Sequence, residues 1–169
     1  MRILIRCEIG GNHGLGHAVR MRALARALGA RGVQVGFVTK TPALAAFVAP
    51  LPLVEALYHS VAFRTLDVYV LDTKDPCRSD RRWRARGIYI VRIDDPSATP
   101  DTSDLLIGPC FHWDEVAVQR LRLDFGERLL YGWDYVILDP EVTAQVPVPY
   151  VERENGPLVF CAGGSDPDG

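Results

Sequence analysis

Short apolar runs alternate with helical patterns along most of this chain, and this alternation restricts the fold more than any other feature. Strands are predicted at 3–7, 33–38, 68–72, 88–93 and 105–107, and helices from about residue 17, near 42–48 and near 79–86. Strands that alternate with helices form βαβ units, in which the strands are parallel. Strands that are covered on both faces lack a clean apolar–polar alternation, and these runs lack it too. We therefore predict an α/β fold with a Rossmann-like parallel sheet and helices on both faces.

The helical patterns predict which faces pack on the sheet. In the first helix, apolar residues recur at helical spacing at Met21, Leu24, Ala25 and Leu28. Gly32 then provides a stop signal. A further helix is predicted over 113–123, with Val116, Leu121 and Leu123 pointing inward. The stripe of the first helix is interpreted as core packing.

The composition limits the classes of protein to which the chain belongs. With 169 residues, 48% hydrophobic residues and a formal net charge of −2, it has enough apolar material for one α/β core and lacks the basic charge of nucleic-acid-binding proteins. The four cysteines are scattered without a Cys-x-x-Cys pair, so no zinc or redox motif is predicted. The first apolar run, of about seven residues, fits neither a signal peptide nor a membrane helix. We expect a cytoplasmic protein with no nucleic-acid partner, no membrane span and no cofactor.

A glycine-rich segment, 9–17, joins the first predicted strand to the first helix. It matches neither the Walker phosphate loop nor the dinucleotide-binding fingerprint. Its glycines, which include Gly14 and Gly16, let the backbone approach a ligand closely, and the unpaired N–H groups of a helix start can bind a phosphate, carboxylate or sugar oxygen. The alternative is a loop that only turns the chain.

His17 falls in the first turn of this helix. The positive end of the helix dipole disfavours imidazolium, so a neutral imidazole that can accept a proton is predicted. The alternative is a structural histidine. His13 stands four residues earlier, a spacing that can chelate a metal within a helix, but the glycines between them and the lack of a third ligand nearby predict no metal site.

Three aspartates follow predicted strands. Asp72 ends one strand, and Asp94 and Asp95 end the next. Because the carboxyl ends of parallel strands meet at one edge of a sheet, these carboxylates are expected at the same edge as His17. There they could orient the imidazole or accept hydrogen bonds from sugar hydroxyls, and the alternative is that they cap the next turn, above all Asp95 before Pro96.

The composition changes toward the carboxyl end. Residues 143–157 are rich in proline and charge and predict a linker after a first domain at 1–142. Residues 158–162 read as a new strand, and Gly163, Gly164 and Ser165 follow as a turn. We expect 158–169 to be the start of a truncated second domain.

A set of motifs spread over the whole chain resembles one enzyme family. The motifs are Arg6-x-Glu8, Gly14-x-Gly16-His17-x-x-Arg20, Asp72, Ile93-Asp94-Asp95, Gly132-x-x-Tyr135 and Gly163-Gly164-Ser165-Asp166. In this order they resemble the UDP-sugar hydrolase of the pseudaminic acid pathway and its spore-coat polysaccharide homologues. That family has the two-domain glycosyltransferase type B fold, so the resemblance implies the amino-terminal half of such a fold and the opening of its nucleotide-binding half.

The resemblance implies hydrolysis of a UDP-sugar. In the family, the histidine that matches His17 activates the water that attacks the anomeric carbon and releases UDP, and Asp94 or Asp72 would orient that histidine or the sugar. The residues implied to bind substrate are Arg6, Gly14, Gly16, Arg20, Asp95, Tyr135, Gly163, Gly164 and Ser165. Two alternatives stay open: a glycosyltransferase of the same fold, and a non-catalytic sugar-binding fragment. A fragment would expose the face between the domains, through which self-association is expected.

Overall fold

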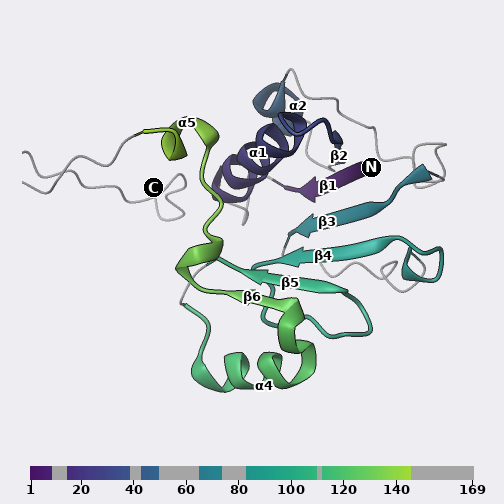
Figure 1. The fold of residues 1–169 in the computed structure, drawn as a ribbon, viewed down its shortest axis with the longest axis vertical. Coiled ribbons are helices and arrows are strands. Elements are labelled where there is room, and N and C mark those ends of the chain that lie inside the picture. Colours follow the sequence, from purple (N-terminus) through teal and green to yellow (C-terminus); the bar gives the residue numbers. More distant parts are fainter. Residues whose placement is uncertain (9–14, 39–42, 50–64, 74–82, 110–111, 146–169) are drawn as a thin grey trace, which may run out of the picture.

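Six parallel strands form one sheet in the part of the chain that the computed structural model describes, namely residues 1–8, 15–38, 43–49, 65–73, 83–109 and 112–145 (Figure 1). The strands are β1 (Arg2–Cys7), β2 (Gln34–Val38), β3 (Val68–Asp72), β4 (Tyr89–Ile93), β5 (Leu105–Gly108) and β6 (Leu129–Tyr131). Their order is β2-β1-β3-β4-β5-β6, and every neighbouring pair is parallel. The prediction of a Rossmann-like parallel α/β sheet is confirmed.

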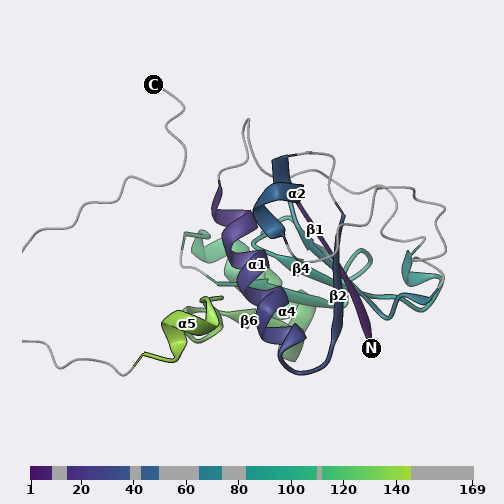
Figure 2. The same cartoon turned by 90° about the horizontal axis from the view of Figure 1, so that it is seen from above.

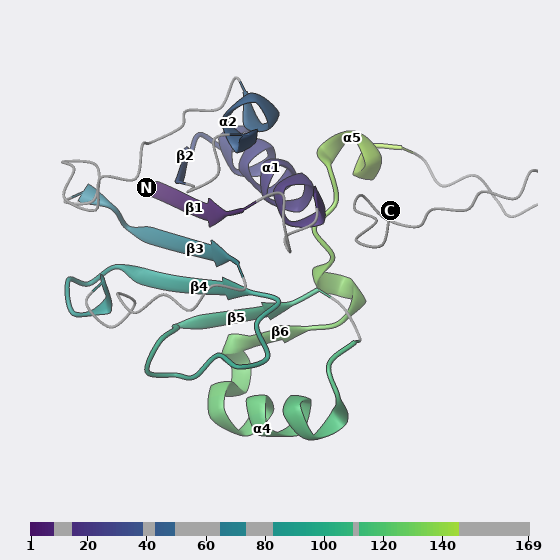
Figure 3. The same ribbon diagram turned by 180° about the vertical axis from the view of Figure 1, so that it is seen from behind.

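The order of the strands reverses at β1. The chain passes from β1 to β2 on one side and then pairs β3 with β1 on the other, so that Ile5 lies between Phe37 and Val70. Open α/β sheets bind ligands outside the carboxyl ends of their strands at such a switch point. In Figure 3 the arrowheads of β1, β3, β4 and β5, which mark these ends, point to one edge of the sheet. A ligand site is therefore expected beyond β1 and β3.

Helices cover both faces of the sheet. They are α1 (Leu15–Gly29), α2 (Ala43–Val48), α4 (Glu115–Phe125) and α5 (Pro140–Thr143), with the 3₁₀ helices η2 (Gly126–Arg128) and η3 (Trp133–Tyr135). Figure 2 shows α2 and α5 on either side of α1. The core on the α1 face includes Leu105 and Ile107, whereas α4 packs against Leu106. Because successive side chains of a strand point to opposite faces, α4 covers the face opposite α1.

The apolar stripe predicted for the first helix faces the core. Met21 and Ala25 are fully buried, and Leu24 and Leu28 pack against them as half-buried residues. Gly32 has a φ of 76°, a left-handed conformation that glycine adopts without strain, and the chain turns there toward β2. The predicted packing and stop are confirmed.

The inward face predicted for the helix at 113–123 is wrong. Val116 and Leu123 are 78% and 88% exposed, and the buried residues of α4 are Val118, Leu121 and Phe125. The Asp114 side chain accepts a hydrogen bond from the Ala117 N–H and caps a helix that begins at Glu115, two residues later than predicted. Of the three residues expected to point inward, only Leu121 is buried.

Several predictions fall on residues outside the described ranges. The helix near 79–86 is described only from residue 83, where 83–84 are helical. The predicted linker is described only as far as residue 145, and the strand at 158–162 lies outside altogether. Within the described residues, no helix has the length and apolar character needed to cross a membrane. Neither β6 nor α5 was predicted.

Candidate active site

The switch point brings His17 and Asp72 together. His17 lies in the first turn of α1, which follows β1, and Asp72 is the last residue of β3, which pairs with β1. Nδ1 of His17 is 2.5 Å from Oδ1 of Asp72. The histidine side chain is 16% exposed and the aspartate 0%. The predicted convergence of this imidazole with a strand-end carboxylate is therefore present.

Arg20 joins this pair to a second carboxylate. Its Nε and one terminal nitrogen each donate to Asp72 at 2.6 Å, and its other terminal nitrogen donates to Asp94 at 3.1 Å. Arg20 stands three residues after His17, so both side chains lie on one face of α1. The result is a cluster of four side chains from α1, from the end of β3 and from the residue after β4: His17, Arg20, Asp72 and Asp94.

The hydrogen bonds of Asp72 decide where the proton of His17 lies. Nδ1 lies 2.5 Å from Asp72 Oδ1, which only accepts hydrogen bonds, and 3.1 Å from a terminal nitrogen of Arg20, which only donates. The shorter contact, with Asp72, is best made by an N–H on Nδ1. In the neutral imidazole with this tautomer, Nε2 carries the lone pair. The pair therefore provides an oriented nitrogen that can accept a proton from a substrate or from water.

Arg20 supplies the charge that a buried carboxylate needs. Burial lowers the pKa of Arg20, but hydrogen bonding and Coulomb attraction to Asp72, and then to Asp94, more than reverse this and raise its pKa above the ordinary value. The guanidinium thus stays charged. It neutralises Asp72, whose burial without a partner would cost several kcal/mol.

Asp94 is held in an unusual backbone conformation. Its φ is 59°, a left-handed value that few residues other than glycine adopt, and its N–H donates to the Ile107 carbonyl at 2.8 Å. Its Oδ1 accepts a hydrogen bond from Trp113 Nε1 at 3.2 Å and lies 3.3 Å from His112 Nε2. The carboxylate is thereby fixed between α1 and the segment that follows β5.

Trp113 and His112 were not predicted as site residues. Gly108, at the end of β5, makes room for Trp113, because a Cβ there would lie 2.6 Å from the indole ring. The indole stacks on Tyr131 of β6 with ring centroids 5.2 Å apart. Trp113 is thus a buried support for Asp94. The only sequence signal for either residue was its position shortly after a strand end.

The other predicted site residues are placed differently. Asp95 accepts hydrogen bonds from Arg92 and from both the N–H and hydroxyl of Ser97, which is the turn-capping alternative. Arg6 is buried in β1 beside Glu8, with Nε 3.4 Å from the carboxylate. Tyr135 is partly exposed in η3. The roles of these three residues in substrate binding stay predictions.

Among the glycines of the segment 9–17, Gly16 lies within the described residues, in the first turn of α1. A Cβ at this position would meet nothing within 4 Å, so the backbone here borders open space. Four other residues that were predicted to bind substrate, all in glycine-rich turns, lie outside the described residues: Gly14, Gly163, Gly164 and Ser165.

Cys7 lies beside this cluster but is unsuited to act as a nucleophile. It is fully buried at the end of β1, opposite Asp72 in the register of the two strands. Burial, and then the negative charges of Asp72 and Glu8, raise the pKa of the thiol far above its ordinary range. Since the thiolate is the reactive form, the chemistry of the cluster rests on imidazole and carboxylate groups. Among the described residues, no group of three or more histidine, cysteine, aspartate and glutamate side chains could hold a metal ion.

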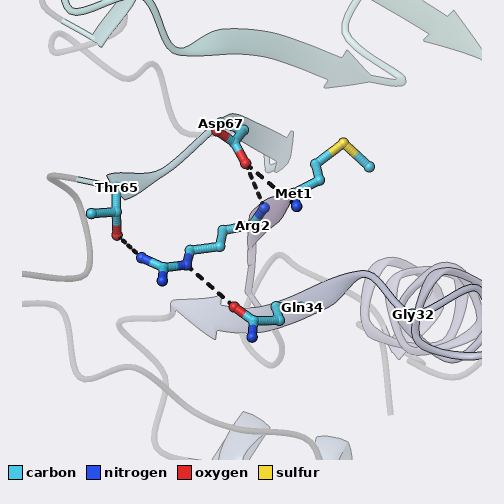
Figure 4. Close-up of a pocket in the computed structure, with 6 residues that line it drawn as sticks. All are labelled: Met1, Arg2, Gly32, Gln34, Thr65 and Asp67. Carbon is cyan, nitrogen blue, oxygen red and sulfur yellow. Dashed lines mark hydrogen bonds and ion pairs between the residues drawn. The ribbon is translucent and has the colours of Figure 1, made fainter.

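A polar hollow of about 540 Å³ lies at the other edge of the sheet, near the start of β1. Figure 4 shows its lining, in which the Arg2 guanidinium is bonded to Gln34 and Thr65, and Asp67 accepts from the Arg2 N–H. The polar groups of these residues already form hydrogen bonds with one another. The hollow lies at the amino ends of the strands, whereas α/β sheets bind ligands at the carboxyl ends.

Comparisons with protein-family models, with curated proteins and with solved structures find no match to this chain. The inference of function therefore depends on the cluster of His17, Arg20, Asp72 and Asp94 and on the sequence motifs that include it.

Proposed function

We propose that this chain is a nucleotide-sugar hydrolase with the glycosyltransferase type B architecture. The observation that carries the proposal is the 2.5 Å contact between His17 Nδ1 and the fully buried Asp72 carboxylate at the switch point of the sheet. This arrangement suits a general base, because the carboxylate orients the imidazole and favours the tautomer that leaves Nε2 able to accept a proton.

The proposed reaction is attack of water on the anomeric carbon of a UDP-sugar. His17 Nε2 accepts a proton from the water as the new C–O bond forms, and the bond between the anomeric carbon and the phosphate oxygen breaks with its electron pair on UDP. Asp72 holds the imidazole and stabilises the positive charge that it gains. Arg20 holds Asp72 in place through two hydrogen bonds, so it acts as a positioning residue.

The first experiment replaces the proposed base. His17→Gln retains a polar side chain but cannot take up the proton, and we expect UDP release to fall by about 10²–10⁴-fold, the usual contribution of a general base. The assay uses a panel of UDP-glucose, UDP-galactose and UDP-N-acetylglucosamine, with the chain in stoichiometric amount so that slow turnover is detected. Arg31→Gln, an exposed change in the turn that follows the far end of α1, is the control and should match the unsubstituted chain.

The second experiment tests the tautomer. Asp72→Asn keeps the size of the side chain but can present N–H to Nδ1, which favours the tautomer with its proton on Nε2. We expect a loss of about 10²–10⁴-fold in kcat with a small change in KM. The proton on Nε2 prevents His17 from acting as the base, while the residues that contact the substrate are unchanged. Wild-type turnover in both the His17 and Asp72 variants would refute the proposal.

The glycosyltransferase alternative is separated in the same assay. A hydrolase releases UDP with water alone, whereas a transferase releases UDP only when an acceptor sugar is added. UDP release that depends on an added acceptor would assign the same base to activation of an acceptor hydroxyl in place of water.

A further inference from the structure

The site contains a second imidazole, which the proposed mechanism does not use. His112 follows β5 at the carboxyl edge of the sheet, and its Nε2 lies 3.3 Å from Asp94 Oδ1. Its side chain is 64% exposed, in contrast to His17. One nitrogen is therefore directed at a fixed carboxylate while most of the ring borders solvent.

Arg20 connects the two imidazoles. It donates to Asp72, which holds His17, and to Asp94, which holds His112. Among the described residues, Asp94 lies directly beside His112 and Arg20 lies beyond Asp94, while Trp113 fixes Asp94 from its own side. Two imidazole–carboxylate pairs lie on either side of one guanidinium.

The remaining groups of this cluster are poorly suited to donate a proton. Arg20 does not give up its proton in proteins, and the oxygens of Asp94 already accept hydrogen bonds from Arg20 and Trp113. A histidine can act as acid as well as base, and two such groups flanking a substrate divide the two proton transfers of a hydrolysis between them. The exposed ring of His112 is open to a bound ligand.

We propose that His112 donates a proton to the departing phosphate oxygen while His17 accepts a proton from the attacking water. In this step the C–O bond to water forms, the bond from the anomeric carbon to phosphate breaks, and its electron pair stays on the phosphate oxygen, which takes the proton of His112. The two imidazoles return to their starting states when a proton passes back through solvent. This inference rests on the proposed hydrolase function and adds the second catalytic residue.

The experiment compares two substitutions of His112 on the full chain. His112→Gln can still donate a hydrogen bond to Asp94 but cannot transfer a proton, and His112→Ala does neither. We expect both to lower UDP release from the accepted UDP-sugar by about 10–10³-fold, within or just below the usual range for general acids. Added imidazole should restore release at least in part to the alanine variant, because the position is open to solvent, but should not restore it to the glutamine variant. Arg122→Gln, an exposed change on α4, is the control and should leave release unchanged.

Each outcome separates the two proposals. Release at the wild-type rate in His112→Gln would overturn proton donation, since a polar contact with Asp94 would then suffice, and would leave the hydrolase proposal intact. A lack of imidazole rescue in His112→Ala would overturn it in the same way. Absence of UDP release from the unsubstituted chain with every UDP-sugar of the panel would overturn the hydrolase proposal and, with it, the step assigned to His112.

Discussion

At the scale of single residues, Asp72 imposes the strictest requirements on its neighbours. A carboxylate with no exposed surface loses its hydration, a cost of several kcal/mol that only paired charges and hydrogen bonds offset. Arg20 donates one hydrogen bond to each of the two carboxylate oxygens of Asp72, and His17 contacts one of these oxygens as well. Because Arg20 also holds Asp94, a change in either aspartate alters the support of the other. The two carboxylates are therefore expected to be energetically coupled, unlike pairs of distant residues.

Gly16 gives a prediction about the ligand itself. Its φ is not left-handed and a Cβ would meet open space, so Gly16→Ala should fold normally and gain up to about 1 kcal/mol of stability from helix propensity. If substrate approaches the start of α1, the added methyl group occupies its space, and we expect a rise in KM of about tenfold, equivalent to the loss of about 1.4 kcal/mol. The measurements are urea unfolding and the kinetics of UDP release.

Gly29→Ala is the matched control for this prediction. Gly29 ends the same helix, also has open space around a built Cβ, and lies at the end of α1 remote from His17. It should show a similar change in stability with unchanged kinetics. Equal KM values in the two variants would remove Gly16 from the substrate site.

The sequence could predict that a strand-end aspartate lies near His17, but not which aspartate contacts it or how Arg20 joins the two carboxylates. His17, Asp72 and Asp94 were located by one rule, that parallel strands place their carboxyl ends at a common edge. The hydrogen bonds of Arg20 depend on how α1 lies over β1 and β3, which no local pattern specifies. His112 stands 18 residues after Asp94 in the chain, and their contact depends on the pairing of β4 with β5.

At the scale of elements, the Asp114 cap of α4 changes which apolar residues are expected to face the core. The sequence offers apolar residues on more than one face, and the prediction of a helix from Trp113 placed Val116 and Leu123 inward. The structure places Trp113 before the cap, with its ring stacked on Tyr131, so Trp113 gives no information about the helix face. Similarly, β6 has only three residues, too few for a periodic signal.

Two leucines of α4 test this assignment with one type of substitution. Leu121 is fully buried and Leu123 is 88% exposed. Leu121→Ala should lower the free energy of unfolding by about 2–5 kcal/mol, because it removes buried contacts and leaves a cavity. Leu123→Ala should change it by about 0.5 kcal/mol or less, as expected for an exposed position. Urea unfolding measures both values, and similar losses in the two variants would mean that the face of α4 is assigned wrongly.

At the scale of the whole molecule, the sheet separates two polar regions. The hollow near Arg2 lies at the amino ends of the strands, and the cluster around Asp72 lies at their carboxyl ends. Between them the strands carry the core residues of both faces, so both regions depend on one cooperative fold. Cys7 stands where this core meets the cluster, which makes its ionisation a probe of the folding of the entire sheet.

The buried thiol of Cys7 predicts how stability depends on alkaline pH. Burial raises its pKa in the folded chain, whereas the unfolded chain releases the proton near the ordinary value of 9.0. The contribution of Cys7 to stability is therefore complete below pH 9 and is lost as the pH rises further, by about 1.4 kcal/mol for each unit above that value. Between pH 8 and pH 10 we expect the free energy of unfolding of the unsubstituted chain to fall by about 1.4 kcal/mol more than that of Cys7→Ala.

The comparison with Cys7→Ala isolates this one group. Other thiols, tyrosines and lysines titrate in both chains, so their contributions cancel in the difference between the two pH dependences. The substitution itself lowers stability at both pH values through lost packing, and this offset also cancels. An identical fall in both chains would mean that Cys7 ionises in the folded state, and a thiolate at the end of β1 would require water to reach the interior of the Asp72 cluster.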